Sequence, residues 1–151
     1  MNTDPETKLT FRATGIDTVF TKGHSMDNEN RKPSPLEIAE YAVSVLDGKK
    51  AKDIKLLHVE KRTIIADYFI ICTGTSRTQI RSLADEVEEK LAERGYPVLR
   101  TEGMDTGTWV LKDFGPLIVH IFNAEYRDFY KLEKLYDETG EVNVEAFLGE
   151  E

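Results

Sequence analysis

The sequence predicts an α/β domain of the α+β type, in which helices flank one mixed five-stranded sheet. Residues 68–73 and 117–122 are almost uninterrupted runs of apolar, mostly β-branched or aromatic side chains. A strand that is apolar on both faces needs cover from both sides, which the helices of an α/β domain supply. Residues 34–48 and 76–95 instead carry apolar side chains at helical spacing. The 151 residues are enough for one such core without disulfides.

The first expected element is a helix that begins after Ser34. Ser34 suits the N-cap, Pro35 the first helical position, and Glu37 completes a capping box. Gly48 is expected to end the helix in a left-handed conformation. The apolar residues at helical spacing are Leu36, Ala39, Ala42, Val43 and Leu46.

Two strands are expected next. The first lies at about residues 53–59, and after a turn at residues 60–62 the second runs to Thr73, with residues 68–72 as its buried part. The turn 74–76 follows them, and a second helix runs from there to Gly95. Its expected core stripe consists of Ile80, Leu83, Ala84, Val87 and Leu91. A strand, a tight turn and a helix form the first half of a crossover. The strand expected near residues 96–100 should therefore run parallel to its predecessor.

The last two strands are expected to form a hairpin, from residues 108–112 and 117–122. Gly115, in the Asp-Phe-Gly-Pro segment between them, can take a positive φ. One final helix should begin at Asn123 or Ala124, with three apolar side chains on one face, namely Phe129, Leu132 and Tyr136. The predicted order is αββαβββα, in a single mixed sheet.

Three segments are expected along the chain. Residues 1–33 lack helical periodicity and are predicted to be a poorly ordered extension. Residues 34–137 contain every expected helix and strand and form the folded domain. Residues 138–151 are predicted to be an acidic C-terminal tail. Met26 is an alternative start of translation, and the sequence leaves open whether residues 1–25 belong to the native protein.

The net charge of −8 comes mostly from the C-terminal part, because residues 125–151 hold nine acidic and three basic side chains. An acidic surface repels phosphate backbones, so direct DNA binding is not expected. RNA binding is also disfavoured, because the sequence has no basic stripe interleaved with aromatic residues. Two interpretations of the acidic region stay open: it favours a basic protein partner, or it serves solubility alone.

Composition also indicates the cellular location of the protein. No apolar run reaches the roughly 18 residues of a membrane span, and the N-terminus has no apolar secretory signal. No contact with a membrane is therefore predicted. The single cysteine, Cys72, cannot form an intramolecular disulfide, so a reducing, cytoplasmic location is expected.

The turn Gly74-Thr75-Ser76 is the candidate for binding a phosphate. Backbone N–H groups at a helix N-terminus favour an anion, but a tight turn followed by an N-cap is the favoured interpretation of the same residues. A nucleotidyl-transferring enzyme also needs paired carboxylates for Mg²⁺ on a strand. The available acids lie instead on the solvent face of the expected helix: Asp85, Glu86, Glu88 and Glu89. A nucleotide-binding or nucleotidyltransferase-like enzyme remains the alternative function.

No catalytic, cofactor-binding or metal-binding residue is predicted. The histidines His24, His58 and His120 are scattered, and with one cysteine they do not make a zinc-ligand pattern. His120 lies in an apolar strand and is expected to be a core or interface histidine. Cys72 is expected to be inert, since it lies in a buried strand.

Aromatic side chains around the hairpin indicate a protein-binding surface. Trp109, the only tryptophan, and Phe114 are followed by Tyr126 and Tyr130 on the last expected helix. Large rigid side chains of this kind are enriched at protein interfaces. Alternation places Trp109 opposite Val110, and whether it closes the core edge or contacts a partner stays open. The acids expected to form a negative rim are Glu102, Asp113, Glu125 and Asp128.

Several segments in a fixed order resemble the ribosomal silencing factor family, also called Iojap-related. Within residues 36–136 they are Asp67–Ser76, Ala84–Glu88, Glu102–Gly103, Trp109–Gly115, Val119–Phe122 and Phe129–Leu135. The resemblance does not extend to the first 33 residues or to the tail after Asp137. Two positions depart from the family pattern. Pro116 stands where an acid is usual, and Tyr136 stands where tryptophan is common.

The resemblance implies a non-enzymatic translation factor with a nucleotidyltransferase-like fold and no cofactor. Its expected partner is the large ribosomal subunit, bound through ribosomal protein uL14 on the face where the small subunit docks. Occupying that face would block subunit association and repress translation under nutrient limitation. The contact residues implied by motif match are Trp109, Val110, Leu111, Asp113 and Phe114. An apolar contact surface also favours a homodimer when the protein is free.

Overall fold

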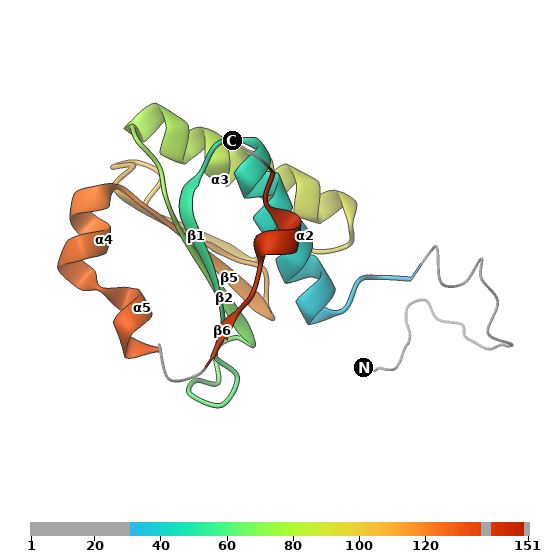
Figure 1. The fold of residues 1–151 in the computed structure, drawn as a ribbon. Helices are drawn as coiled ribbons and strands as arrows, with labels where there is room; N and C mark the ends of the chain where they lie inside the picture. Colours follow the sequence, from blue (N-terminus) through green and yellow to red (C-terminus); the bar gives the residue numbers. More distant parts are fainter. Residues whose placement is uncertain (1–30, 137–139, 150–151) are drawn as a thin grey trace, which may run out of the picture. The chain divides into compact units, whose positions relative to one another are not determined.

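A six-stranded mixed sheet forms the centre of the domain (Figure 1). The computed structural model describes residues 31–136 and 140–149. In chain order the elements are α2 (Pro35–Gly48), β1 (Lys52–His58), β2 (Tyr68–Thr73), α3 (Arg77–Glu93), β3 (Arg100–Glu102), β4 (Trp109–Asp113), β5 (Leu117–Phe122), α4 (Ala124–Tyr130), α5 (Leu132–Leu135), β6 (Glu141–Val142) and the 3₁₀ turn η2 (Glu145–Phe147).

The strand order is β3-β4-β5-β2-β1-β6. The two apolar strands β2 and β5 are neighbours and run parallel, whereas every other neighbouring pair is antiparallel. Parallel neighbours require a crossover connection, which α3, β3 and β4 together provide. The predicted fold class is confirmed, and so is the order αββαβββα as far as α4.

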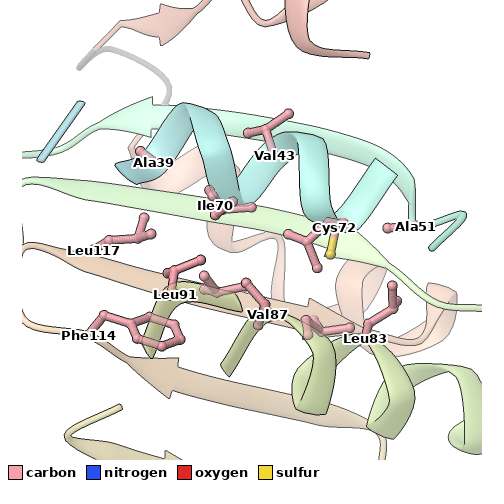
Figure 2. Close-up of a cluster of buried hydrophobic side chains, with 14 of the residues drawn as sticks. Ala39, Val43, Ala51, Ile70, Cys72, Leu83, Val87, Leu91, Phe114 and Leu117 are labelled. Atoms are coloured by element: carbon pink, nitrogen blue, oxygen red, sulfur yellow. The ribbon is translucent and has the colours of Figure 1, made fainter. Parts of the chain in front are cut away.

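Helices α2 and α3 cover one face of the sheet, which we call the covered face (Figure 1). Their apolar stripes pack against alternate residues of the strands, as period-two side chains require. Figure 2 shows this cluster, in which the labelled side chains include Ala39, Val43, Ile70, Cys72, Leu83, Val87 and Leu91. All of them are fully buried. The core stripes predicted for the two helices are thus confirmed, except that Leu36 is exposed.

Both ends of α2 have identifiable caps. The capping box is confirmed, since the Glu37 N–H donates to Ser34 Oγ at 3.2 Å and the Ser34 N–H donates to Glu37 Oε1 at 2.8 Å. The left-handed conformation predicted at Gly48 is wrong, because Lys50 adopts it, with φ of 73°. The Ala51 N–H then bonds back to a carbonyl of the last helical turn, 3.0 Å away. The reversal therefore falls two residues after the glycine.

The strand predicted near residues 96–100 begins later, as β3, and pairs only with β4. It runs in the same direction as β2, as expected, but β4 and β5 lie between them. The chain first reverses at Gly95, which has φ of 92°. Tyr96 is then buried, and its hydroxyl donates to the Pro33 carbonyl at 2.6 Å. Packing of these residues against the core delays the strand.

The predicted single last helix is wrong, because the chain forms two short helices that meet at Lys131. This residue takes a left-handed conformation, with φ of 50° and ψ of 45°. The break removes the common face predicted for three apolar residues. Leu132 and Tyr136 pack against the sheet, whereas Phe129 is 77% exposed.

Residues 140–149 are part of the sheet and its core rather than a separate acidic tail. β6 pairs antiparallel with β1 and makes the sheet six-stranded instead of five-stranded. Val144 is buried, and Phe147 packs against the cluster of the covered face. The Gly149 N–H donates to the Asp47 carboxylate at 2.6 Å. Residues 1–30 of the extension predicted at 1–33, and with them the alternative start at Met26, lie outside the described residues.

Candidate protein-binding surface

Strand β4 divides the five predicted contact residues between the two faces of the sheet. Val110 is fully buried in the covered face, and Phe114, just after the strand, is buried there too. Trp109, Leu111 and Asp113 lie on the opposite side and are partly exposed. The alternation follows from the two-residue period of a strand. Val110 and Phe114, which were predicted to contact a partner, are therefore core residues. The other three residues of the set remain on the surface.

Trp109 lies between the core and the surface. Its ring stacks on Phe122 at a centroid distance of 4.7 Å and contacts Tyr130 at 5.0 Å. Its indole Nε1–H donates to Nδ1 of His120 at 3.2 Å. The side chain thus closes one edge of the second apolar cluster and keeps part of its surface open. The sequence left open whether Trp109 closes the core edge or is available to a partner, and its position is compatible with both.

Helix α4 extends the aromatic area beyond Trp109. Tyr130 contacts both Tyr126 and Phe129, at centroid distances of 5.9 and 5.0 Å. The exposed fractions of these three residues are 47, 39 and 77%, respectively. We call the side chains of Trp109, Tyr126, Phe129 and Tyr130 the aromatic face. Sequence reasoning missed Phe129 as a surface residue, because it assigned that ring to the core side of one continuous helix.

Arg127 fixes the position of α4 through a set of hydrogen bonds. Its guanidinium donates to the Asp53 carbonyl at 2.7 Å and to the Thr73 hydroxyl at 2.8 Å. It also forms a bidentate ion pair with Glu133 of α5, with N–O distances of 2.8 and 3.1 Å. The Arg127 side chain is 11% exposed, and this pairing lowers the pKa of Glu133. One largely buried cation therefore links both short helices to the start of β1 and the end of β2.

The predicted acidic rim is partly neutralised by basic side chains. Arg100 contacts Glu102 and lies 3.7 Å from the Asp113 carboxylate. Asp128 pairs with Lys131 at 3.2 Å. Glu125, in the first turn of α4, is exposed. The negative charge beside the aromatic face is thus weaker than the sequence alone suggests.

His120 lies beneath the aromatic face and is 4% exposed. Burial lowers its pKa to about 3, so the imidazole is neutral at neutral pH. Phe69 packs against its ring edge-on at 4.9 Å. Within the described part of the chain, its Nε2 atom has no hydrogen-bond partner. Of the two predicted environments, core or interface, burial matches the core, but among the described residues the ring is not fully hydrogen-bonded, as a satisfied core histidine would be.

The groups of the Gly74-Thr75-Ser76 turn are bonded internally. Both the N–H and the hydroxyl of Thr75 donate to Oε1 of Gln79, at 2.6 and 3.0 Å, and Ser76 Oγ accepts from the Gln79 N–H. A Cβ atom on Gly74 would come within 2.6 Å of the Ile80 side chain. The glycine therefore permits close packing of helix on strand, and the turn matches an N-capped helix start rather than an open phosphate cradle.

The structure also shows the surroundings of the cysteine and of the acidic residues considered in the sequence analysis. Cys72 is fully buried, and burial raises the pKa of its thiol to about 12, which keeps it protonated. Glu88 does not simply face solvent, because it pairs with the buried ammonium of Lys112. Among residues 31–136 and 140–149, no three histidine, cysteine or acidic side chains gather as a metal site. No helix in these ranges is long and apolar enough to cross a membrane.

Comparison with known proteins decides the family. A family model described as ribosomal silencing factor during starvation matches residues 32–151. The chain belongs to the ribosomal silencing factor family. The match includes the residues after Asp137, which sequence analysis had placed outside the resemblance. Ribosomal silencing factors act in translation regulation, so the fold and the aromatic face belong to a ribosome-related regulator.

Individual relatives and a solved structure agree with this assignment. The ribosomal silencing factor of Halalkalibacterium halodurans is 36% identical over 112 residues, which are 74% of this chain and 96% of that protein. A mouse protein named mitochondrial assembly of ribosomal large subunit protein 1 is 33% identical over 100 residues, covering 64% of this chain and 44% of its own length. The crystal structure of a Chromobacterium violaceum protein matches with a TM-score of 0.68 at 36% identity, over 70% of this chain and 88% of that one.

Proposed function

We propose that this ribosomal silencing factor binds the large ribosomal subunit through ribosomal protein uL14 and sterically blocks association with the small subunit. Translation is thereby repressed under nutrient limitation. The factor acts in the cytoplasm by binding, without catalysis or a cofactor. The family description and the name of the mouse relative, which refers to assembly of the large subunit, support a ribosomal partner.

The aromatic face is the observation that carries this proposal. Trp109 stacks on Phe122 and contacts Tyr130, so neighbouring rings restrict its movement before any partner arrives. Rigid aromatic anchors lose little conformational freedom on binding and dominate many protein interfaces. Together with Leu111 and the exposed rings of α4, it forms a surface suited to a protein rather than to a small molecule. Val110 and Phe114 support this surface from the core.

Charge agrees with a basic protein partner. The net charge of −8 opposes nonspecific attachment to ribosomal RNA. Glu125, which is exposed in the first turn of α4 beside the aromatic face, complements a basic patch and orients its approach. We therefore assign the partner contact to the surface part of the predicted set, Trp109, Leu111 and Asp113, extended by α4.

Sedimentation with isolated large and small subunits tests the proposal. The native protein is expected to cosediment with large subunits alone and to reduce the fraction of joined ribosomes. Phe129→Ala removes a ring that is mostly exposed, so the domain should stay folded while the affinity falls at least about fivefold. Ile64→Ala is the matched control, because Ile64 is fully exposed in the loop between β1 and β2.

Two results would contradict this assignment. Binding to neither subunit would remove the proposed mechanism. Equal binding by native protein, Phe129→Ala and Trp109→Ala would leave the ribosomal partner in place but move the contact surface elsewhere.

We also infer that the free protein uses the aromatic face to form a homodimer. Exposed, contiguous rings favour association with a second copy until a partner covers them. Sedimentation equilibrium should show concentration-dependent dimerisation that Phe129→Ala weakens. A protein that stays monomeric over the accessible concentrations would refute the dimer.

A further inference from the structure

The indole of Trp109 is directed by a single hydrogen bond from beneath the aromatic face. Trp109 of β4 pairs with Phe122 of β5, and Leu111 pairs with His120. His120 is therefore the diagonal neighbour of Trp109 across the two strands, within reach of a long side chain. The Nε1–H of the indole lies 3.2 Å from Nδ1 of His120 and donates to it.

The imidazole can accept this bond only in one state. A histidine nitrogen accepts when the ring is neutral and the proton is on the other nitrogen. His120 is neutral at neutral pH, because burial lowers its pKa to about 3. Its own ring is fixed by edge-on contact with Phe69 at 4.9 Å. The acceptor therefore points in one direction and gives the indole one preferred orientation.

This arrangement is unfavourable for stability taken alone. The proton must reside on Nε2, yet Nε2 has no partner among the described residues. A buried donor without a partner is costly, whereas an apolar side chain of similar size has no such group. Among the described residues, the hydrogen bond that this buried ring makes is the one with the indole of Trp109, the partly exposed ring that it contacts.

We propose that His120 is a positioning residue for partner binding, which fixes the orientation of Trp109 without touching the partner. The inference rests on the proposed function, because it takes the aromatic face as the contact surface. A ring already held in the bound orientation loses less freedom on association, so affinity rises without a new contact. Loss of the acceptor should weaken binding while the fold stays intact.

A matched pair of substitutions tests the proposal. His120→Asn keeps an acceptor oxygen on the same branch as Nδ1, whereas His120→Leu has nearly the same shape and no acceptor. Affinity for isolated large subunits should fall about tenfold for His120→Leu and less than about threefold for His120→Asn. Stability in urea should rank the other way, with His120→Leu at least as stable as His120→Asn. Equal affinities of the two variants, or affinities that follow stability, would overturn the proposal.

Spectroscopy gives a readout that does not depend on the ribosome. Trp109 is the only tryptophan, so one indole ¹H–¹⁵N resonance reports its hydrogen bond. That resonance should shift upfield and exchange faster with water in His120→Leu than in His120→Asn. An indole signal identical in native protein and His120→Leu would show that the bond does not hold the ring, and would overturn the proposal.

A variant of the tryptophan separates the two possible failures. In a Trp109→Phe background the donor is gone, so His120→Leu should lower affinity no further. A further tenfold loss there would mean that His120 acts by another route. If Trp109→Ala leaves affinity unchanged, the contact surface and the positioning role both fail. If Trp109→Ala abolishes binding while His120→Leu matches His120→Asn, only the positioning role fails.

Discussion

The two faces of the sheet differ in the length of the helices that cover them. The covered face carries α2 and α3, of 14 and 17 residues, and its side chains are almost all buried. The opposite face carries α4 and α5, of 7 and 4 residues, and rings remain partly exposed beside them. Long amphipathic helices remove apolar surface from water and stabilise the fold. Short ones leave surface available for a partner.

Substitutions on the two faces should therefore separate stability from binding. Leu83→Ala, in the covered face, should lower the free energy of unfolding by about 3 kcal/mol, because it leaves a cavity where the side chain was fully buried. Leu111→Ala, on the other face, should cost less than about 1 kcal/mol and lower affinity for large subunits. Urea unfolding and cosedimentation measure both. The comparison breaks if Leu111→Ala destabilises as much as Leu83→Ala.

The next largest effect concerns the attachment of α4. Arg127→Met should cost about 2 kcal/mol, because it leaves the Glu133 carboxylate without its partner and releases α4 from the sheet. Binding should weaken as well, since the rings of the aromatic face lie on α4. Lys131→Ala removes an exposed pair with Asp128 and a more distant attraction to Glu133, so it should cost much less and serves as the comparison. Unchanged stability of Arg127→Met would mean that α4 is held in another way.

The pH dependence of stability should reveal the buried histidine. The folded pKa of His120 is about 3, well below its ordinary value, so the unfolded chain takes up a proton first as the pH falls below about 6.5. Stability should therefore fall by about 1 kcal/mol between pH 7 and pH 5.5 from this group. His120→Leu should remove that part of the slope. An identical slope in both proteins would show that His120 is not buried in solution.

The smallest effect is expected at the start of α3. Ser76→Ala removes the side chain that accepts from the Gln79 N–H and should cost about 1 kcal/mol. Since this cap lies outside the aromatic face, affinity for large subunits should not change. Calorimetry with ATP, CTP and Mg²⁺ should give no binding heat, because the groups of the turn are bonded to Gln79. Saturable heat that Ser76→Ala abolishes would revive the nucleotide-binding alternative.

The parts of the fold predicted from sequence depend on local signals. The capping box at Ser34, the apolar runs of β2 and β5 and the positive φ of Gly115, at 98°, all follow from the nature of one short segment. Each of these features needs no distant residue to be recognised. Their combination was sufficient for the fold class and for most of the order of elements.

The parts that were missed depend on distant contacts. The break at Lys131 accompanies the pairing of Arg127 with Glu133 and with groups at the ends of β1 and β2. Strand β6 is two residues long, and its apolar neighbour Val144 is hidden in acidic composition. Neither feature has a local sequence signature. Periodicity therefore predicted one continuous last helix, and charge predicted an acidic tail.

The candidate site was predictable in part. For Trp109 the sequence left open the core edge and the contact surface, and strand alternation placed Val110 on the face opposite to it. The family resemblance assigned the contact to every residue of the motif, including Val110 and Phe114, which are buried. The hydrogen bond from Trp109 to His120 could not be foreseen, because it depends on the register of β4 against β5.

The sheet ends on both sides in very short strands. β3 has three residues and β6 has two, and charged side chains occupy both, including Arg100, Glu102 and Glu141. Long, flat, apolar edges invite other chains to add a strand, and such addition leads to aggregation. Here each edge strand exposes few unpaired backbone N–H and C=O groups. An aromatic surface on this domain is therefore not accompanied by a long sheet edge along which further chains could add strands.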